Sequence, residues 1–530
     1  MMITLYILNI VVLTFIVGIR YVEIMYILQL EKYKFRRCIG WFVDHLKDRR
    51  FLFPTVLSLV QFIFLAWFSK YMWILVLTLA LNVFYIPFIR SRSQQKVKFV
   101  YTYRIKRLIG ASILIDILFY VLTRLIVVRY YNEWELIMVW LSVIHFLQVD
   151  VLLFAFCLMI PVEKAIGQHF INKAKHKLNL ISPQVIGVTG SYGKTSTKEM
   201  IHRVLGHHYF VCASPASFNT PFGISRTINE RLRKIDQVLI CEMGATKKGD
   251  IEELVNLVHP TIGIITEIGP QHFESFQNMS NIIKTKFELI EGLPKDGLAV
   301  LNYDNRFIRG YQLSSPKNIL TYGIVEDDVH YRAINVEYGI FGSRFDVVFP
   351  DQSVHSFRTK LLGLHNIYNV LAAIVVGSYM NLPVKHIQQQ VERLEPIPHR
   401  LELKTYESYT IIDDSFNSNR EGFGHALNVL NQFHNKKAII TPGIIDLGEE
   451  HYAINYRLAS QMARVCDLVV LIGKKQTKPL YDGLLEAGYP MENILVTSHF
   501  HEGFNMVLER LQRDFTLLIE NDLPDQYTEE

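Results

Sequence analysis

The sequence predicts a multi-domain fold, in which a region of N-terminal α-helical transmembrane segments precedes two α/β domains. Apolar residues make up 50% of the 530 positions and charged residues 20%. In a chain of this size, that balance indicates a membrane-embedded part. Roughly the first 160 residues hold most of the apolar surplus, whereas the rest has the Gly and Pro punctuation of soluble α/β proteins. We expect the boundary near Pro161.

The predicted transmembrane region, residues 1–161, contains about five helices. The apolar stretches that are long enough to cross a bilayer are residues 3–19, 51–68, 71–89, 110–128 and 135–160. The first lacks a small-residue cleavage site, so we expect it to remain as an anchor. Basic islands at about 32–50 and 90–107 are expected in the cytoplasm. The prediction is therefore a multi-pass plasma-membrane protein with cytoplasmic catalytic domains.

Four ionisable residues fall inside the predicted spans: Asp116, Arg124, His145 and Asp150. Such groups are costly in lipid and commonly mark a pathway or a binding site. They also pair between helices as structural links. The sequence leaves both interpretations of Asp116 and Asp150 open.

Residues 162–182 are expected to link the membrane region to the soluble part. Between Val162 and Leu178, apolar and basic side chains alternate; they are Ile166, Phe170, Ala174 and Leu178 on one side and Lys164, Lys173, Lys175 and Lys177 on the other. This pattern predicts an amphipathic helix at the membrane surface.

Charge and cysteine usage exclude other classes of protein. The net charge is +5, but the basic residues gather beside apolar segments, so we expect no nucleic-acid partner. The five cysteines show neither a CxxC pair nor zinc-ligand spacing: Cys38, Cys157, Cys212, Cys241 and Cys466. Neither a disulfide framework nor a structural zinc site is indicated.

After Pro183, short β-rich runs alternate with helical stretches, which is typical of parallel α/β sheets. The first series is VIGVT, VLICEM, TIGIITEI and GLAVLN, and the second is TIIDDS, KAIITPG, LVVLIG, NILVT and FTLLIE. The alternation over residues 331–348 predicts a β-hairpin between them. We therefore expect two domains, residues 183–392 and 393–530, with the prolines of EPIPH at the join.

The segment VIGVTGSYGKTSTKEM predicts a phosphate loop, because a strand, a glycine turn and a helix start follow one another. Glycine lets backbone N–H groups face an anion at a helix N-terminus, Lys194 reaches phosphates, and Thr195 offers a hydroxyl to Mg²⁺. The loop candidates are Gly190, Ser191, Gly193, Lys194, Thr195 and Ser196. Only two residues separate the glycines, where the common loop has four, so a coincidental turn is the alternative for this motif alone.

The loop TGSYGKTST resembles that of the Mur ligase family, which includes folylpolyglutamate synthase, and further motifs recur in family order over about residues 183–520. The resemblance implies a central α/β P-loop ATPase domain and a C-terminal α/β Rossmann-like domain. It also implies ATP as a substrate and Mg²⁺ at two sites.

The resemblance assigns metal ligands. Glu242 in LICEMGA stands where the family has an acidic Mg²⁺ ligand, beside Thr195. His272 in PQHFESF matches the histidine that helps to hold a second Mg²⁺. Lys286 in KTKFELI matches a lysine that many members carry as a carbamate, which provides oxygen ligands.

The resemblance also assigns nucleotide contacts. His365, Asn366 and Asn369 in GLHNIYNVLAAI match the adenine-recognition helix, and Arg400 in PIPHRLE matches an arginine aimed at the transferred phosphate. Asp414 matches an aspartate near the ribose. Three polar residues follow it and either orient the incoming amine or form an Asx-turn: Ser415, Asn417 and Asn419.

The implied reaction joins a carboxylate to an amine through an acyl-phosphate, with Lys194, His272, Lys286 and Arg400 as the catalytic set. The segments EMGA, DDSFNSN and DLGEE are most similar to the MurF-type branch, which adds D-alanyl-D-alanine. Three departures concern substrate recognition: spans replace the uridine-nucleotide-binding domain, Arg420 stands where proline is usual, and LLIENDLPDQY lacks a basic segment. We therefore expect the acceptor to be a lipid-linked or UDP-linked glycopeptide, and the amine to be an amino acid or a dipeptide.

Other functions fit parts of the sequence. Spans beside a phosphate loop suggest an ATP-driven transporter, but an LSGGQ-like segment is absent and ligase motifs are present. A catalytically silent scaffold would not need every phosphate and metal residue. Within the ligases, a poly-γ-glutamate-type or other membrane-linked amino-acid ligase is the main alternative, and the sequence does not separate it from a MurF-type enzyme.

Overall fold

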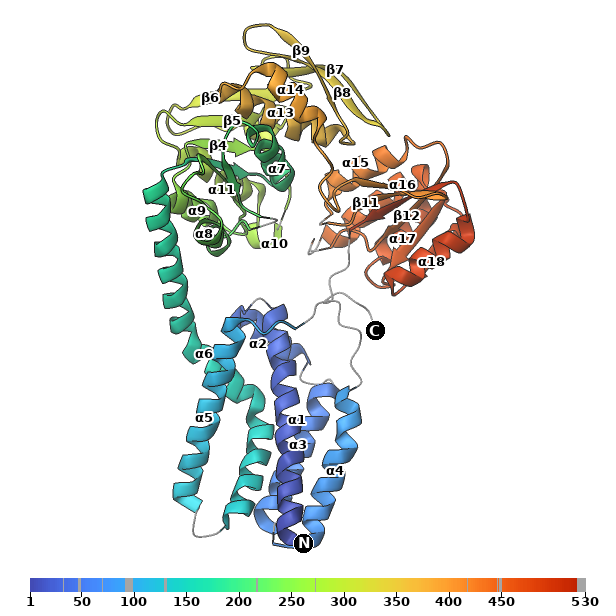
Figure 1. Ribbon diagram of the computed structural model, residues 1–530. Coiled ribbons are helices and arrows are strands. Elements are labelled where there is room, and N and C mark those ends of the chain that lie inside the picture. Colours follow the sequence, from blue (N-terminus) through green and yellow to red (C-terminus); the bar gives the residue numbers. More distant parts are fainter. Residues whose placement is uncertain are drawn as a thin grey trace. The chain divides into compact units, whose positions relative to one another are not determined.

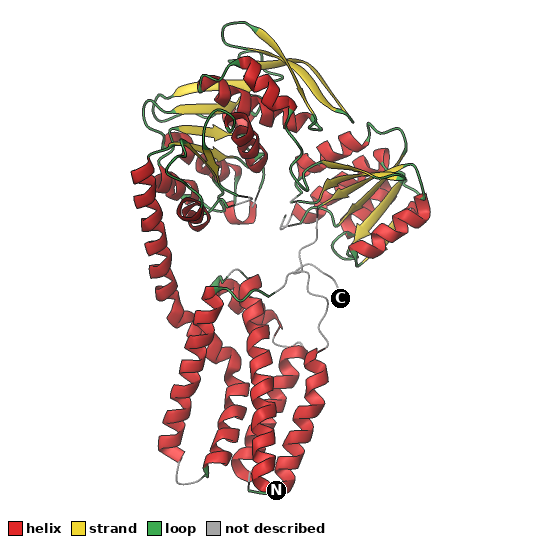
Figure 2. Cartoon of the chain, viewed as in Figure 1, coloured by secondary structure: helices red, strands yellow, loops and turns green. Residues whose placement is uncertain are grey.

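The computed structural model describes residues 1–31, 33–45, 49–68, 70–90, 99–127, 131–215, 218–271, 273–416, 418–445, 447 and 450–521. The chain divides into two compact units, Met1–Gln168 and His169–Glu530. The first is all-helical, and the second holds two β-sheets with helices around each (Figures 1 and 2). We call them the helical unit and the enzyme unit.

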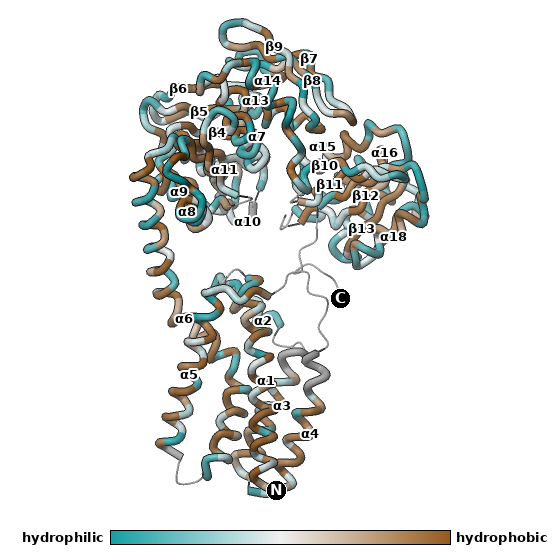
Figure 3. Tube along the Cα trace, viewed as in Figure 1, coloured by the Kyte–Doolittle hydropathy of each residue, from teal (hydrophilic) through white to brown (hydrophobic). Residues whose placement is uncertain are grey.

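The helical unit contains each predicted span as a helix. Its helices are α1 (Met2–Leu30), α2 (Phe35–His45), α3 (Arg49–Phe68), α4 (Met72–Arg90), α5 (Tyr103–Val127) and the first part of α6 (Glu133–Ile181). Hydrophobic residues dominate the long helices α1, α3, α4 and α5 and the first part of α6, whereas α2 is mixed (Figure 3). Three described helices are long and apolar enough to cross a membrane, namely Met2–Leu30, Tyr103–Leu125 and Glu133–Ile181; the apolar segments Phe53–Phe68 and Met72–Tyr85 are shorter. Helix α2, within the first basic island, was not predicted.

Helix α6 continues through Pro161, where the sequence suggested a boundary. The apolar face of its last turns is covered by protein: Ala174 and Leu178 are buried in a core of the enzyme unit, and Phe170 stacks on Phe222 with ring centroids 5.1 Å apart. The prediction that this face lies on the membrane surface was therefore wrong for these residues. An amphipathic pattern shows that one face of a helix is apolar and covered, but the same pattern arises whether lipid or protein covers it.

The first sheet of the enzyme unit has nine strands in the order β2-β3-β1-β4-β5-β6-β7-β8-β9. The strands are β1 (Gln184–Thr189), β2 (Val211–Ala213), β3 (Val238–Glu242), β4 (Ile262–Ile265), β5 (Leu298–Asn302), β6 (Asn318–Gly323), β7 (Tyr331–Gly339), β8 (Gly342–Val348) and β9 (Val354–Thr359). Pairing is parallel from β2 to β7 and antiparallel from β7 to β9, which confirms the hairpin expected at residues 331–348.

Helices cover both faces of this sheet, and neighbouring residues of one strand serve opposite faces. Ile240 packs with α7 (Lys194–Leu205) and α13 (Leu364–Tyr379), whereas Leu239 packs with α8 (Pro221–Glu230), α9 (Asp250–Val258) and α11 (Met279–Glu291). Burial on both sides explains why these strands are continuous apolar runs in the sequence. The remaining helices are α10 (Phe273–Phe276), α12 (Arg306–Arg309) and α14 (Val384–Glu392).

The second sheet has six strands in the order β10-β11-β15-β12-β13-β14. They are β10 (Glu402–Thr405), β11 (Tyr409–Asp414), β12 (Lys436–Thr441), β13 (Leu468–Ile472), β14 (Ile494–Thr497) and β15 (Phe515–Glu520). Only β10, an unpredicted edge strand, is antiparallel to its neighbour. One face packs on α15 (Arg420–Leu430), α16 (His451–Val465) and α17 (Lys478–Glu486), and the other on α18 (Phe500–Leu511).

The last turns of α6 offer a test of their packing on the enzyme unit. Leu178 is 6% exposed and Leu180 is 72% exposed. We expect Leu178→Ala to destabilise the enzyme unit by about 2–3 kcal/mol, because it leaves a cavity. Leu180→Ala should change stability by about 0.5 kcal/mol or less. Pulse proteolysis of full-length protein in urea and detergent would measure both, and equal midpoints would contradict the packing.

Candidate active site

The phosphate loop lies between β1 and α7, and two of its residues must be glycine. Gly190 has φ +152° and Gly193 has φ +76°. A Cβ would lie 2.1 Å from Thr266 Oγ1 at Gly190 and 2.7 Å from Asn369 Oδ1 at Gly193. The backbone therefore approaches its neighbours more closely than any side chain permits. Helix α7 begins at Lys194, so its free N–H groups and positive dipole end meet the loop.

Lys194 folds back over this loop. Its Nζ donates to the carbonyl oxygens of Gly190 at 2.8 Å and Ser191 at 2.9 Å. Burial lowers the pKa of Lys194 to about 8 against the opposing charge of Glu242, and Arg400 lowers it further. An anionic phosphate would stabilise the buried Lys194 ammonium, because it would replace the water that the ammonium loses on burial.

The serines of the loop are structural in their observed contacts. Ser191 Oγ donates to the Gly269 carbonyl at 2.8 Å and accepts from its N–H at 3.1 Å, which fastens the loop to the segment after β4. Ser196 is buried in the first turn of α7.

Glu242, at the end of β3, has the features of a metal ligand. It is 1% exposed, and its Oε1 accepts from Asn219 Nδ2 at 3.0 Å. Its Oε2 has no hydrogen-bond partner among the described residues. A buried carboxylate oxygen without a partner is costly, and a hard cation such as Mg²⁺ would satisfy it.

Lys198 is a residue of this site that the sequence analysis missed. It is fully buried, donates to the Ser214 carbonyl at 2.6 Å, and holds its Nζ 3.5 Å from Glu242 Oε2. It lies four residues after Lys194 on α7, so the helical spacing was a signal that could have identified it. Lys198 therefore places a positive charge beside the Glu242 carboxylate.

Lys286 on α11 is 2% exposed. Burial lowers the pKa of its amine well below the usual range; Lys194 acts in the same direction, while Asp250 and Glu288 oppose it. Only a neutral amine reacts with CO₂, so the environment fits the carbamate that the resemblance implies. The other predicted metal ligand, His272, lies outside the described residues.

The three residues assigned to adenine recognition lie in the first turns of α13. The side-chain amides of the two asparagines form hydrogen bonds within the protein. Asn369 Oδ1 accepts from Thr197 Oγ1 at 3.0 Å, and Asn366 Nδ2 donates to the Leu362 carbonyl at 2.9 Å. Burial lowers the pKa of His365 to about 3, with His425 and Arg400 adding to the effect. His365 is therefore a neutral imidazole, and its Nδ1 has no partner among the described residues.

Arg400 reaches the phosphate loop from the segment before β10. Its Nη2 donates to Thr195 Oγ1 at 3.4 Å, and its guanidinium lies 4.7 Å from the Phe416 ring centroid. The flanking residues His399 and Leu401 have φ of +63° and +46°. Non-glycine residues adopt this region at a cost, so surrounding contacts must hold the turn in place.

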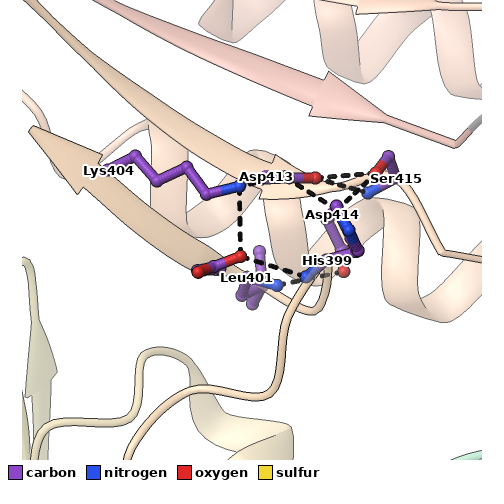
Figure 4. Close-up of polar contacts among 7 residues, drawn as sticks. His399, Leu401, Lys404, Asp413, Asp414 and Ser415 are labelled. Carbon is purple, nitrogen blue, oxygen red and sulfur yellow. Dashed lines mark hydrogen bonds and ion pairs between the residues drawn. The ribbon is translucent and has the colours of Figure 1, made fainter. Parts of the chain in front are cut away.

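A set of charged and polar residues, which we call the Arg400 brace, supplies those contacts (Figure 4). Asp413 Oδ2 pairs with His399 Nδ1 at 2.9 Å and with Lys404 Nζ at 2.6 Å. Glu402 accepts from the His399 N–H at 3.2 Å, and Asp414 Oδ1 accepts from the Leu401 N–H at 3.1 Å. The brace therefore fixes the backbone on both sides of Arg400.

His399, Glu402 and Asp413 bring ligand atoms within 4.8 Å of one another, close enough to hold a metal ion. Lys404 Nζ, however, lies 3.2 Å from Glu402 and 2.6 Å from Asp413. The protein thus supplies the cation for these carboxylates, and we interpret the set as structural.

The polar residues after β11 are engaged with the protein. Ser415 directs its hydroxyl and N–H to Asp413 Oδ1 at 2.7 and 3.3 Å, as in an Asx-turn, and Asn419 caps α15. Asn417 lies outside the described residues. Burial raises the pKa of Asp414 to about 6, partly offset by its bond from Leu401 and by Arg400.

A cavity of about 340 Å³ connects these groups. Its lining includes Lys194, Thr195, Glu242, Asp250, Arg400 and Asn419. The phosphate loop and the carboxylate come from the first sheet, and Arg400 and Asn419 come from the second. The space can therefore take a phosphate chain between a lysine, an arginine and a metal-binding carboxylate.

Comparison with known proteins finds similar sequences and folds. Residues 188–377 match the Mur ligase middle domain. The UDP-N-acetylmuramoyl-tripeptide–D-alanyl-D-alanine ligase of Bacillus subtilis is 30% identical over 279 residues, which are 52% of this chain and 59% of that protein. The Escherichia coli ligase of the same name is 26% identical over 298 residues, 56% of this chain and 66% of that protein. The chain spans less than two thirds of the length of these relatives.

Among solved structures, the MurF ligase of Thermotoga maritima in complex with ADP superposes with a TM-score of 0.60 at 22% identity, over 67% of this chain and 80% of that one. At this identity the match concerns the fold. The resemblance to the Mur ligase family is confirmed for the part of the chain that these matches cover. Residues 188–377 therefore match the Mur ligase middle domain, and about half of the chain is similar to MurF-type ligases.

Proposed function

We propose that this protein is a membrane-anchored, ATP-dependent ligase that joins an acceptor carboxylate to an amine through an acyl-phosphate. One observation carries the proposal: Lys194, Glu242 and Arg400, from two sheets, line one cavity at the phosphate loop. The relatives are named as ligases of UDP-N-acetylmuramoyl-tripeptide and D-alanyl-D-alanine, and these names support the same class of reaction.

In this proposal, residues 183–392 bind ATP and residues 393–530 form the domain that completes the site. The phosphates lie along Gly190 to Ser196, as in other glycine loops at helix N-termini. His365, Asn366 and Asn369 lie toward the base, and Asp414 toward the ribose. The Thermotoga maritima neighbour, which has the same fold, is in complex with ADP, and this supports a nucleotide as a ligand.

The proposed Mg²⁺ ligands are Thr195, Glu242, His272 and carbamylated Lys286, at two sites. Two observations support them: Oε2 of buried Glu242 accepts no hydrogen bond among the described residues and has only the 3.5 Å ion pair with Lys198, and burial lowers the pKa of Lys286. When bound, Mg²⁺ would supply positive charge beside the phosphates.

The residues of this chain act by positioning and by charge. An oxygen of the acceptor carboxylate forms a bond to the γ-phosphorus of ATP, the bond to the bridging oxygen breaks, and ADP leaves. Lys194 and Arg400 offset the charge on the transferred group. The amine then attacks the acyl carbon, loses a proton, and inorganic phosphate departs.

We propose an acceptor that is a glycopeptide of the cell envelope, and an amine that is an amino acid or a dipeptide. The printed names of the relatives support UDP-N-acetylmuramoyl-tripeptide and D-alanyl-D-alanine as the reference pair. The apolar helices of this chain favour a lipid-linked acceptor at the cytoplasmic leaflet of the plasma membrane.

The substrate can be identified with purified full-length enzyme. ATP and candidate amino acids or dipeptides would be supplied with either lipid-extracted or soluble UDP-linked precursors, and the amide product identified by mass spectrometry. Ligation onto the lipid-linked precursor is expected. Efficient ligation onto the soluble precursor alone would refute the lipid-linked acceptor and leave a tethered MurF-type enzyme.

The first prediction for the proposed activity concerns the phosphate loop. Lys194→Ala should reduce ADP formation by at least about a hundredfold, because it removes a charge that stabilises the transferred phosphate. Membrane insertion should not change. Lys295→Ala removes a similar charge from the exposed surface and should leave turnover as in the wild type. Undiminished turnover in Lys194→Ala would eliminate this loop as the ATP site.

A second prediction concerns the carbamate. Lys286→Ala should lose at least about 99% of activity. Added bicarbonate should not restore it, whereas short carboxylic acids should do so in part by providing oxygen ligands. Lys284→Ala, an exposed residue of the same helix, is the control. Wild-type kinetics in Lys286→Ala would remove this lysine from the metal site.

The third prediction concerns the Arg400 brace. Asp413→Asn should lower kcat about 10- to 100-fold, because it misplaces Arg400. Combined with Arg400→Ala, it should add little further loss, since both changes remove the same contribution. Asp482→Asn breaks an exposed pair with Lys478 in the same domain and serves as the control. Fully additive losses would show that Asp413 acts independently of Arg400.

A further inference from the structure

Of the nine buried polar atoms of the helical unit that have no hydrogen-bond partner among the described residues, six lie in one layer of the helices. They are Arg20 Nη1, Gln61 Oε1, Asn82 Nδ2, both ring nitrogens of His145 and Gln148 Oε1. All five side chains are at most 3% exposed. A buried polar group without a partner is destabilising, so several of them together indicate a position that another molecule fills.

These atoms come from four helices that meet in one layer. Ile16 of α1, Leu57 of α3 and Tyr85 of α4 form one apolar cluster, which places the neighbouring turns side by side. Helix α6 joins them, because Gln148 Nε2 donates to the Val17 carbonyl at 2.5 Å and the His145 ring lies 6.3 Å from the Tyr85 ring.

The layer contains more hydrogen-bond donors and positive charge than acidic side chains. Arg20 is permanently charged and is an electrostatic neighbour of both Tyr85 and His145. The Asn82 amide and the imidazole add donors. Glu23, three residues along α1, offsets the Arg20 charge in part. Asp116 accepts a hydrogen bond from the Tyr21 hydroxyl at 2.9 Å through Oδ2, and its Oδ1 has no hydrogen-bond partner among the described residues. Helices α3 and α4 contain no acidic residue. This chemistry fits an oxyanion.

The surroundings restrict the source of that oxyanion. Arg20 lies ten residues before the end of α1 at Leu30, and Tyr85 five before the end of α4 at Arg90. At the helical rise these positions are about 15 Å and about 8 Å inside the helix ends that carry the basic islands. An anion between apolar helices at this depth is most readily delivered on a lipid, whose chains occupy the same medium.

We propose that this layer, around Arg20, Asn82 and His145, binds the phosphate group of a lipid, and that this lipid carries the acceptor. The second part rests on the proposed ligase function. The first part does not. Arg20 would form a charge-assisted bond to phosphate oxygen, which is stronger than a bond between neutral groups. Asn82 and one His145 nitrogen would donate to the remaining oxygens.

Binding can be measured without turnover. Full-length protein in detergent, without ATP, would be titrated with polyprenyl phosphate, with polyprenol and with inorganic phosphate, and the bound species counted by native mass spectrometry. Polyprenyl phosphate should bind at least about tenfold more tightly than either, which corresponds to about 1.4 kcal/mol. Equal binding of polyprenol would exclude recognition of phosphate, and equal binding of inorganic phosphate would exclude a lipid source.

Variants assign the binding to the layer. Arg20→Met and His145→Phe should each weaken the binding of polyprenyl phosphate about tenfold or more, because each removes a proposed donor to phosphate oxygen. His145→Phe should do so without lowering thermal stability, because both ring nitrogens of His145 lack a hydrogen-bond partner among the described residues. Asn82→Leu is a third variant of the layer, which keeps the test available if Arg20→Met or His145→Phe does not fold. Arg124→Gln, which removes an exposed arginine paired with Glu133, is the control.

Unchanged affinity in the layer variants would mean that only water or packing satisfies these atoms, and would overturn the site. The ligase proposal fails separately. If polyprenyl phosphate binds as expected but the lipid-linked precursor is not ligated, the phosphate site stands and the lipid-linked acceptor is excluded. If ligation proceeds and the layer variants bind and react as wild type, the site is excluded and the ligase remains.

Discussion

The close packing of the turn between β1 and α7 is the constraint on which the catalytic arrangement depends. Thr266 after β4 and Asn369 of α13 approach Gly190 and Gly193 so closely that no Cβ could be present. The turn is therefore held from two sides, and the first N–H groups of α7 have a fixed direction. Lys194, Thr195 and Glu242 take their positions from this turn and from the strand beside it.

The second sheet contributes to the same cavity through a turn that is itself strained. His399 and Leu401 both have positive φ, and the Arg400 brace bonds to the backbone of each. Strain of about 1–3 kcal/mol per residue persists only where surrounding contacts determine the conformation. This charged network thus holds the backbone from which the Arg400 guanidinium extends.

The helical unit follows a different rule. In the enzyme unit, buried charges such as Lys198 and Glu242 lie beside opposite charges. In the helical unit, Arg20 and His145 bring buried polar atoms together with no hydrogen-bond partner among the described residues. Because apolar helices offer no solvent to such atoms, this layer is where the helical unit differs most from a simple anchor.

The sequence by itself determined the elements whose physics is local. Each predicted strand of the two series is present, because strands buried on both faces are continuous apolar runs. Each predicted span is a helix, and the phosphate loop is recognisable from its glycines, which the backbone requires. The Mur ligase resemblance depended on these short segments, and the match over residues 188–377 confirms it.

Only the tertiary structure decided the features that join residues far apart in the chain. The apolar face around Ala174 could have met lipid or protein, and its pattern is the same in both cases. The brace joins residues 399–404 to residues 413–415, and the polar layer joins four helices between residues 20 and 148. Such contacts form only when the backbone has brought distant elements together, and the periodicity of one segment carries no record of its partner.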